Sequence, residues 1–300
     1  MMAAAGSPPL ETMPVDVARE MANGLFASMA GELAPVAKVE DRTAPGPAGD
    51  IPLRVYTPAG QGPFPILLYF HGGGWTIGNR DAYDGPCRAL ARAVPCVVAS
   101  VEYRLAPEHK FPAAAEDCYA VTRWMGEHGA TLGGDPGRVA IGGDSAGGNL
   151  TAVVALMARD RGGPRLAHQV MIYPATDAAL QTASYRDNAD GYFLTTSTMR
   201  WFWGNYLTGP ADVENPYVSP LRATDHRGLP SATILTAEFD PLRDDGESYA
   251  QALRAADVPV RLKRFDGQIH AFLSLAGTFP QAAVAIEDIA ADLRSAFVRR

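Results

Sequence analysis

The sequence predicts an α/β protein with a mostly parallel β-sheet that is covered by helices on both faces. Short apolar runs of strand length alternate with longer segments of helical spacing along most of the chain. A glycine-rich turn joins one of these strands directly to a helix, as expected where strands and helices alternate. The 300 residues suit one large domain of this class, and the pattern yields about eight strands.

The composition argues against a nucleic-acid-binding protein, a membrane-spanning protein and a disulfide-rich or zinc-binding protein. The chain has 26 Lys and Arg residues against 33 Asp and Glu residues, a net charge of −7 that disfavours a nucleic-acid surface. The longest apolar runs, such as residues 66–70, are far shorter than a membrane span. Residues 1–6 lack the basic region and apolar core of a signal peptide, so we expect a cytoplasmic protein without stable membrane association. Cys87, Cys96 and Cys118 are too few and too scattered for a disulfide framework or a zinc site.

An amphipathic helix is predicted over residues 10–33. One face carries apolar side chains at spacings of three and four, namely Val15, Ala18, Ala22, Leu25, Phe26 and Met29. This face lacks the flanking Lys and Arg of a membrane-surface helix, so we expect it to pack against the protein itself.

The remaining elements follow from apolar runs and from the turn residues between them. Strands are predicted at residues 36–40, 51–56, 65–70, 96–101, 138–141, 166–173, 232–236 and 258–265. Helices are predicted at residues 89–93, 113–128, 150–157, 246–256 and 281–298. The turn-rich residues 44–50 are expected to connect the first two strands. Pro112 stands where a first helical turn tolerates proline, and Pro174 stops the sixth strand.

Residues 176–227 interrupt this alternation. They contain no strong strand signal, and a helix is expected around residues 198–203. Trp201, Phe202 and Trp203 follow one another in that helix, where consecutive side chains point about 100° apart. The three rings therefore cannot all face one pocket, and we expect one or two of them to pack on the body of the protein.

A candidate nucleophile lies in the glycine-rich turn. Gly143-Asp-Ser145-Ala-Gly147 stands between the strand at residues 138–141 and the helix at residues 150–157. A Gly-x-Ser-x-Gly nucleophile elbow requires this strand-to-helix context. The glycines leave room for a tight turn, and the helix N-terminus favours negative charge beside the Ser145 hydroxyl.

A base and an acid are expected at the same edge of the sheet, because the carboxyl ends of parallel strands meet there. His270 follows the last predicted strand and is the best candidate for the base that a serine nucleophile needs. Asp240 follows the preceding strand and is the candidate acid, with Glu238 as the alternative. Asp244 and Asp245 fit the cap and first turn of the next helix.

A second glycine-rich segment, His71-Gly-Gly-Gly74, follows the strand at residues 65–70. The backbone N–H groups of Gly73 and Gly74, together with that of Ala146, are expected to bind the oxygen of a tetrahedral intermediate. One such donor typically contributes about 3–4 kcal/mol in the transition state.

Five segments together resemble the bacterial hormone-sensitive-lipase-like esterases, in the subgroup with a Gly-Asp-Ser-Ala-Gly elbow. They are residues 71–75 (His-Gly-Gly-Gly-Trp), 103–108 (Tyr-Arg-Leu-Ala-Pro-Glu), 143–149 (Gly-Asp-Ser-Ala-Gly-Gly-Asn), 240–246 (Asp-Pro-Leu-Arg-Asp-Asp-Gly) and 269–270 (Ile-His). The order Ser, Asp, His is also that of α/β-hydrolases. The resemblance runs from about residue 51 to the C-terminus. Gln268 and Ala271 stand where the family often has Met and Gly, which affects the detail of that loop.

The resemblance implies an α/β-hydrolase fold with a helical cap. The catalytic core would comprise residues 46–175 and 228–300, and the cap would comprise the N-terminal helices in residues 1–45 and the insertion in residues 176–227. The implied activity is hydrolysis of short-chain acyl esters through an acyl-enzyme intermediate, with no metal or cofactor.

The resemblance also implies a role for each motif residue. Ser145 would be the nucleophile, His270 the base and Asp240 the acid that orients it. Gly73, Gly74 and Ala146 would form the oxyanion hole, and His71, Gly72 and Asp144 would support the loops. For the substrate pocket we expect Trp75, Leu25, Phe26, Trp201 and Phe202.

Other functions remain open from the sequence. An amidase or a specialised deacetylase would use the same triad, and a long-chain lipase would differ by activation at a lipid interface. A non-catalytic small-molecule receptor on the same fold lacks the base, so His270 argues against it. The expected partner is a small-molecule ester.

A homodimer along the last strand, residues 258–265, is also expected, as in the family that the chain resembles. Pro259, Arg261, Lys263 and Arg264 would equally serve to protect an edge strand from pairing.

Overall fold

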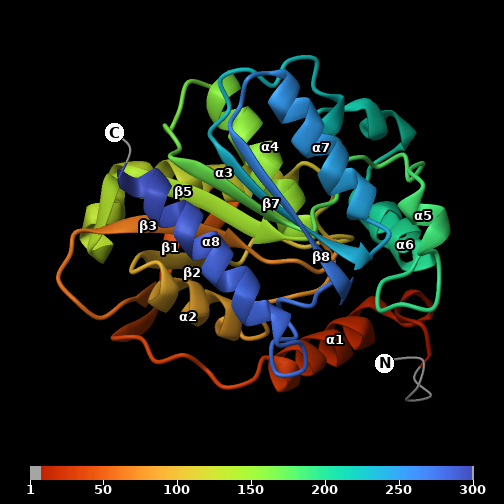
Figure 1. The fold of residues 1–300 in the computed structure, drawn as a ribbon, viewed down its shortest axis with the longest axis horizontal. Helices are drawn as coiled ribbons and strands as arrows, with labels where there is room; N and C mark the ends of the chain where they lie inside the picture. The colour runs from red at the N-terminus through yellow and green to blue at the C-terminus, as the bar shows by residue number, and fades with distance from the viewer. Residues whose placement is uncertain (1–7, 299–300) are drawn as a thin grey trace.

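The strands form one eight-stranded sheet in the computed structural model, which describes residues 8–298 (Figure 1). In sheet order they are β1 (Lys38–Gly46), β2 (Gly49–Thr57), β4 (Val97–Val101), β3 (Phe64–Phe70), β5 (Gly134–Asp144), β6 (His168–Ile172), β7 (Ala232–Phe239) and β8 (Val260–Ile269). The β1–β2 and β2–β4 pairs are antiparallel, and the other five pairs are parallel. The predicted mostly parallel sheet of eight strands is therefore confirmed.

Helices cover both faces of the sheet, as predicted. α3 (Ala113–His128), α4 (Ala146–Asp160) and α7 (Arg243–Ala255) lie on one face, and α2 (Asp84–Ala93) and α8 (Gln281–Val298) lie on the other (Figure 1). α1 (Val15–Met29), α5 (Ser184–Asp187) and α6 (Thr196–Tyr206) lie near the carboxyl ends of the parallel strands. Within residues 8–298, every helix is too short or too polar to cross a membrane.

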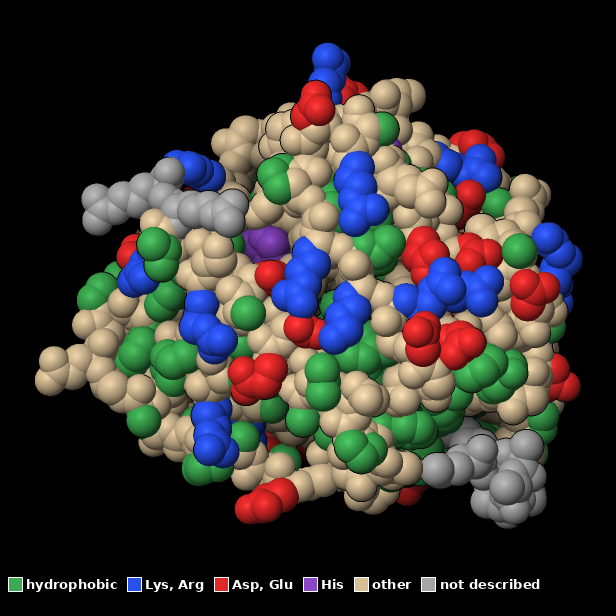
Figure 2. Space-filling model, in the orientation of Figure 1, with side chains coloured by type: hydrophobic (Ala, Val, Ile, Leu, Met, Phe, Trp, Pro, Cys, Tyr) green, Lys and Arg blue, Asp and Glu red, His purple; other side chains and the backbone are tan. Residues whose placement is uncertain are grey.

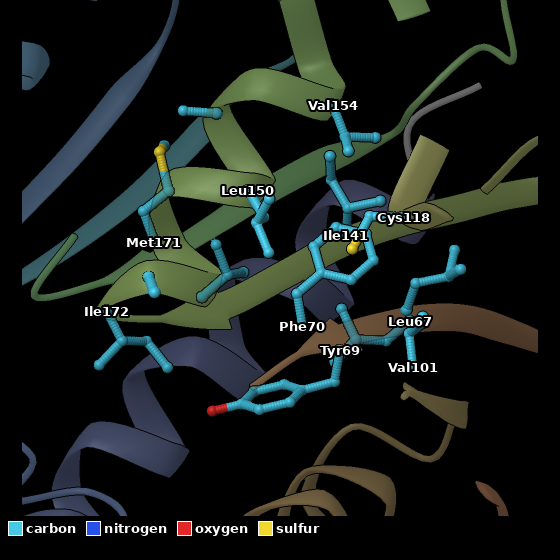
Figure 3. Close-up of a cluster of buried hydrophobic side chains, with 14 of the residues drawn as sticks. Leu67, Tyr69, Phe70, Val101, Cys118, Ile141, Leu150, Val154, Met171 and Ile172 are labelled. Carbon is cyan, nitrogen blue, oxygen red and sulfur yellow. The ribbon is translucent and has the colours of Figure 1, made fainter. Parts of the chain in front are cut away.

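The central strands are buried because helices pack on both of their faces. The last five residues of β3, Ile66 to Phe70, are all buried, without the alternation of a strand that faces water on one side. Figure 3 shows Leu67, Ile141 and Leu150 in one cluster of buried side chains from β3, β5 and α4. Burying one such large apolar side chain contributes about 1.5–3 kcal/mol. This packing gives the carboxyl edge of the sheet a rigid support.

The N-terminal helix is shorter than predicted. Residues 10–33 were expected to form one helix, but the structure has a 3-10 turn at Leu10–Thr12 and then α1 from Val15 to Met29. Pro14 separates the two because its backbone is extended, with φ −53° and ψ 144°. Gly31, with φ +79°, lies just beyond the other end, where glycine favours a change of direction.

The first hairpin is tighter than predicted. The connection expected at residues 44–50 is mostly strand, because β1 continues to Gly46 and β2 begins at Gly49. Ala44 pairs with Ile51 in the antiparallel register, and both side chains are buried. Ladder hydrogen bonds and this contact outweigh the local turn signal of the sequence.

The insertion between β6 and β7 contains α5, α6 and two 3-10 turns, and no strand, as predicted. Trp203 packs against Trp75 with ring centroids 4.2 Å apart, so this ring faces the body of the protein. Thr198 of α6 donates a hydrogen bond to the Glu11 carboxylate, at 2.9 Å, and thereby joins the insertion to the N-terminal segment. The assignment of both segments to one cap, with bounds at 1–45 and 176–227, stays a prediction, and residues 1–7 of it lie outside the described residues.

β8 lies at one end of the sheet, as predicted. Its basic side chains are held by neighbouring helices: Lys263 by Asp288 of α8, and Arg264 by Glu247 of α7. Figure 2 shows basic and acidic side chains interspersed over the face on which α7 and α8 lie.

Pairing of two chains along β8 stays a prediction. An edge strand presents backbone donors and acceptors that a second copy can pair with. The expected result of light scattering at micromolar concentration is the mass of two chains. A mass of one chain at that concentration would contradict the homodimer.

Candidate active site

Ser145 is the single residue between β5 and α4, and its backbone is strained. Its φ of +56° and ψ of −117° lie in a region that residues with side chains rarely adopt, at a cost of roughly 1–3 kcal/mol. The Ser145 N–H donates to the carbonyl oxygen of Ile172 at 2.8 Å. A Cβ on Gly147 would overlap the carbonyl oxygen of Phe70, so the motif glycine lets α4 approach β3 closely. The turn presents the Ser145 hydroxyl at the carboxyl edge of the sheet.

The structure brings Ser145, His270 and Asp240 into one hydrogen-bonded chain. His270 Nε2 lies 2.9 Å from Ser145 Oγ, and His270 Nδ1 lies 2.7 Å from Asp240 Oδ2. An ionised Asp240 accepts from Nδ1–H, which leaves Nε2 to accept from the serine hydroxyl. The last strand was predicted to end at residue 265, but β8 pairs with β7 as far as Ile269, so His270 follows its end directly.

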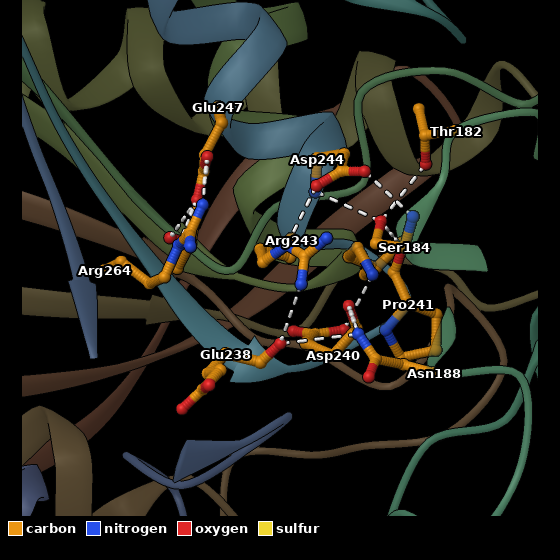
Figure 4. Close-up of polar contacts among 12 residues, drawn as sticks. Thr182, Ser184, Asn188, Glu238, Asp240, Pro241, Arg243, Asp244, Glu247 and Arg264 are labelled. Atoms are coloured by element: carbon orange, nitrogen blue, oxygen red, sulfur yellow. Dashed lines mark hydrogen bonds and ion pairs between the residues drawn. The ribbon is translucent and has the colours of Figure 1, made fainter. Parts of the chain in front are cut away.

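Asp240 is fully buried and is fixed by the backbone around it. The Leu242 N–H donates to its Oδ1 at 2.8 Å, which leaves Oδ2 for His270. The Asn188 side chain, which follows α5 in the insertion, donates to the Asp240 carbonyl oxygen at 3.1 Å (Figure 4). The insertion therefore helps to hold the segment that carries the acid.

The alternative acid Glu238 and the neighbouring Asp244 and Asp245 bind elsewhere. Glu238 accepts from the Gly267 N–H at 2.7 Å, and Asp244 accepts from the Ser184 N–H at 2.8 Å. Asp245 accepts from the backbone N–H of Thr176 at 3.1 Å. Within residues 8–298, Asp240 is thus the acid that hydrogen-bonds His270.

The glycines after β3 form a turn beside Ser145. Gly73 and Gly74 have φ of +107° and +57°, and a Cβ on Gly74 would overlap the Phe202 ring. In the described chain, the N–H groups of Gly73, Gly74 and Ala146 donate to no other residue. Ala146 is the first residue of α4, where N–H groups have no intrahelical acceptor and the helix dipole favours negative charge.

Asp144 connects β5 to the glycine turn. Its Oδ1 accepts from the Tyr69 hydroxyl at 2.8 Å and from the Gly72 N–H at 3.0 Å, and its Oδ2 accepts from the Tyr83 hydroxyl at 3.4 Å. Burial raises the pKa of Asp144 to about 6, against the lowering effect of these hydrogen bonds.

His71 lies on the other side of the same turn. Its ring stacks on Tyr103, with centroids 4.3 Å apart, and its Nδ1 donates to the Gly72 carbonyl oxygen at 2.7 Å. Burial lowers the pKa of His71, so the ring is neutral near pH 7. The Tyr103 hydroxyl donates to the His71 carbonyl oxygen at 2.7 Å.

A cavity of about 710 Å³ opens above Ser145. Gly73, Gly74, Ser145 and His270 are among the residues that line it. Its apolar walls include Ala22, Phe26, Ile77, Tyr83, Phe193 and Phe202, which come from α1, the loop after β3 and the insertion. The space is of the size that binds a small organic ligand.

Only two of the five predicted pocket residues, Phe26 and Phe202, line this cavity. Trp75 is fully buried beneath it, stacked on Tyr206 with ring centroids 4.4 Å apart. Leu25 is adjacent to Phe26 on α1 and therefore points about 100° away. Trp201 does not line the cavity, and its ring packs against that of Phe202 with centroids 5.1 Å apart. The prediction was wrong for Trp75, Leu25 and Trp201, because helix phase and stacking turn them away.

Sequence reasoning missed several residues around the site. Asn188 had no signal, because its contact depends on how the insertion folds back. Tyr69 stands among apolar residues in a buried strand, and this pattern indicates a hydroxyl that needs a buried acceptor. Tyr173 packs against the His270 ring, with centroids 4.7 Å apart.

Comparisons with known proteins agree on one family. A family model described as alpha/beta hydrolase fold matches residues 67–274. The carboxylic ester hydrolase LipN of Mycobacterium tuberculosis is 49% identical over 243 residues, which are 79% of this chain and 65% of LipN. The carboxylesterase NlhH of the same organism is 45% identical over 261 residues, which are 85% of this chain and 81% of NlhH.

A solved structure is also similar. The ester-hydrolase EH1AB1 from the metagenome of Lake Arreo, complexed with a derivative of bipyridine phosphonate, superposes with a TM-score of 0.95 at 41% identity. The match covers 98% of this chain and 94% of that one.

The raised pKa of Asp144 has a consequence for stability. Because the folded-state pKa, about 6, lies above the ordinary value of 3.8, ionising this carboxyl disfavours the folded state as pH rises between these values. As the pH rises from 4 to 7, we expect the free energy of unfolding of Asp144→Asn to increase relative to that of wild type by on the order of 2–3 kcal/mol. Urea unfolding of both proteins across that range measures the difference. A difference that does not change with pH would contradict the ionisation of buried Asp144.

Proposed function

We propose that this chain, which belongs to the α/β hydrolase fold family, is a serine carboxylesterase that hydrolyses short-chain acyl esters. The observation that carries the proposal is the hydrogen-bonded chain from Ser145 through His270 to buried Asp240. A serine hydroxyl is a weak nucleophile until an adjacent base accepts its proton. This arrangement supplies the base, the acid that orients the base, and a cavity for the ester.

In the proposed reaction, the Ser145 oxygen attacks the ester carbonyl while His270 Nε2 takes the hydroxyl proton. The tetrahedral intermediate collapses when the bond to the alcohol oxygen breaks, and His270 gives its proton to the departing alcohol. Water then loses a proton to His270 and attacks the acyl-enzyme. The carboxylic acid leaves and the Ser145 hydroxyl is restored. Asp240 holds the imidazole and stabilises its charged form throughout.

The proposed oxyanion hole comprises the N–H groups of Gly73, Gly74 and Ala146. Their freedom from other acceptors in the described chain supports this role. The negative charge on the carbonyl oxygen grows in the transition state, so these donors stabilise it more than they stabilise the bound ester. His71, Gly72 and Asp144 are proposed to support the turn that carries them.

The relatives support ester hydrolysis. LipN is named a carboxylic ester hydrolase and NlhH a carboxylesterase, although the match spans less than two thirds of LipN. An amidase or a specialised deacetylase with the same residues is the second candidate, and competition between matched ester and amide substrates separates them. A cytoplasmic location stays a prediction.

The direct test is hydrolysis of p-nitrophenyl butyrate. Wild type is expected to release nitrophenol by saturable kinetics, and Ser145→Ala, which removes only a hydroxyl, is expected to keep the fold and lose nearly all turnover. A wild-type protein without activity on any ester would favour the receptor alternative. Equal turnover by Ser145→Ala would place the nucleophile elsewhere.

The acid is distinguished from its neighbour by a pair of variants. Asp240→Asn is expected to lower kcat by a factor on the order of 10⁴, because the imidazole loses the tautomer that accepts from serine. Glu238→Gln, whose side chain binds Gly267 instead, is the matched control and is expected to stay near wild type. Steady-state kinetics on p-nitrophenyl butyrate gives both values. The opposite ranking would move the acid to Glu238.

Acyl-chain length is expected to be limited by the walls of the cavity. Each methylene that enters an apolar pocket contributes about 0.8 kcal/mol, and a chain that outgrows the pocket gains nothing. Activity is expected to peak at about four to six acyl carbons and to fall steeply by about ten. The measured quantity is the ratio of kcat/KM for butyrate and decanoate esters.

Phe26→Ala enlarges the cavity and is expected to lower that ratio by about tenfold, whereas Leu25→Ala, one residue away and outside the cavity, is the matched control. A wild-type preference for decanoate would rule out a bounded pocket. Equal ratios for the two variants would show that Phe26 does not limit the acyl chain.

A further inference from the structure

Arg19 of α1 connects the N-terminal helix to two loops beside the active site. Its Nε donates to the carbonyl oxygen of Thr76 at 2.7 Å, and its Nη2 donates to that of Ala106 at 2.8 Å. The two terminal guanidinium nitrogens also donate to the Glu108 carboxylate, Nη1 at 2.8 Å and Nη2 at 2.6 Å. One side chain therefore joins three segments that are distant in the sequence.

Asn23 follows Arg19 by one helical turn and makes a second contact with the same loop. Residues four apart lie on one face of a helix. The Asn23 Oδ1 accepts from the Gly78 N–H at 3.0 Å. Residues 71–78, which we name the oxyanion loop, are thus held by α1 at two backbone positions, Thr76 and Gly78.

These contacts act on the part of the loop that carries the proposed oxyanion donors. The Gly73 carbonyl oxygen accepts from the N–H groups of Thr76 and Ile77, at 3.0 and 2.9 Å. The peptide unit between Gly73 and Gly74 is planar, so the direction of the Gly73 carbonyl fixes that of the Gly74 N–H. The Thr76 hydroxyl donates to the Gly74 carbonyl oxygen at 3.0 Å and fixes the next peptide unit. Displacement of Thr76 therefore turns the Gly74 donor.

The segment at residues 103–108, Tyr-Arg-Leu-Ala-Pro-Glu, holds the oxyanion loop from the other side. The Ala106 N–H donates to the Trp75 carbonyl oxygen at 2.8 Å, and the Tyr103 hydroxyl donates to the His71 carbonyl oxygen at 2.7 Å. Arg104 is anchored on the buried Asp117 of α3 through its Nη2, at 2.7 Å. This segment has no part in the proposed proton transfers. Its hydrogen bonds to the backbone of the oxyanion loop indicate that it helps to hold that loop in position.

We infer that Arg19, assisted by Asn23, is a positioning residue that sets the direction of the oxyanion-hole donors. The inference rests on the proposed function, since it concerns the reaction that those donors serve. α1 then has two tasks: Ala22 and Phe26 line the cavity, and Arg19 and Asn23, which lie close to them around the same helix, hold the oxyanion loop.

A surface ion pair is the competing interpretation. The Glu108 side chain is 55% exposed, and exposed ion pairs contribute little to stability. The Arg19 side chain is only 24% exposed, and two of its hydrogen bonds go to backbone carbonyls instead of Glu108. If the ion pair is what matters, removing Glu108 and removing Arg19 have similar effects on kcat. If Arg19 positions the loop through the backbone carbonyls, removing Arg19 has the much larger effect.

The test is steady-state kinetics on p-nitrophenyl butyrate with the full chain. Arg19→Met is expected to lower kcat by about 10- to 100-fold with KM changed by less than about threefold, because only the transition state uses the donors fully. Arg19→Lys is expected to recover part of kcat, and Asn23→Ala to lower it more weakly. Glu108→Gln is expected to stay within about threefold of wild type.

Arg161→Met is the matched control. Arg161 forms a two-point ion pair with Glu116, with both contacts at 2.8 Å, away from the oxyanion loop. It is expected to keep the wild-type kcat. A trifluoromethyl ketone, which becomes tetrahedral on the nucleophile, is expected to bind Arg19→Met more weakly by the same factor by which kcat/KM falls.

The outcomes separate the two hypotheses. Wild type without esterase activity would refute the proposed function itself. An active wild type with equal kcat for Arg19→Met and Arg161→Met, or an effect of Arg19→Met on KM alone, would overturn the positioning role. If Arg19→Met does not fold, the kcat values of Arg19→Lys and Asn23→Ala test the positioning role instead. A wild-type kcat in both variants would overturn that role.

Discussion

The turn at Ser145 is the constraint on which the rest of the site depends. A residue with a side chain is held at φ +56° because β5 and α4 are both fixed by packing on either side of it. Gly147 permits this only because a hydrogen in place of a Cβ faces the Phe70 carbonyl oxygen. Burial of the central strands and of α4 offsets the local strain. The serine hydroxyl consequently has one position relative to the ends of the neighbouring strands.

The partners of Ser145 are placed by the same sheet. β7 and β8 are parallel neighbours, so Asp240 and His270, which follow them, arrive at one edge. A fully buried carboxylate is costly unless donors surround it, and the Leu242 N–H and the His270 ring supply two. Asp144 is a second buried acid one residue before the serine, and its donors are the Gly72 N–H and two tyrosine hydroxyls. The site thus contains two buried carboxylates, each with its own set of hydrogen-bond donors.

The strand and helix order and the three reacting residues could be predicted from the sequence, because each is marked by a pattern of nearby residues. Gly-Asp-Ser-Ala-Gly lies between a strand and a helix, and the two later residues follow strands whose apolar runs are plain. Contacts that depend on tertiary packing had no such signal. Asn188 reaches Asp240 only after the insertion folds back, and Arg19 reaches Thr76 only after α1 docks. Leu25, Trp75 and Trp201 were wrongly assigned to the pocket. The residue type alone does not show in which direction a helix or loop orients an apolar or aromatic side chain.

The most direct measurement of the central claim is covalent labelling with a fluorophosphonate, followed by mass spectrometry of the intact chain and its peptides. A phosphonate reacts with an activated serine and leaves an adduct that mimics the tetrahedral intermediate. The expected result is one adduct per chain, located on Ser145, which disappears in Ser145→Ala and forms far more slowly in His270→Ala. An adduct on any other residue, or equal labelling rates with and without His270, would contradict the account.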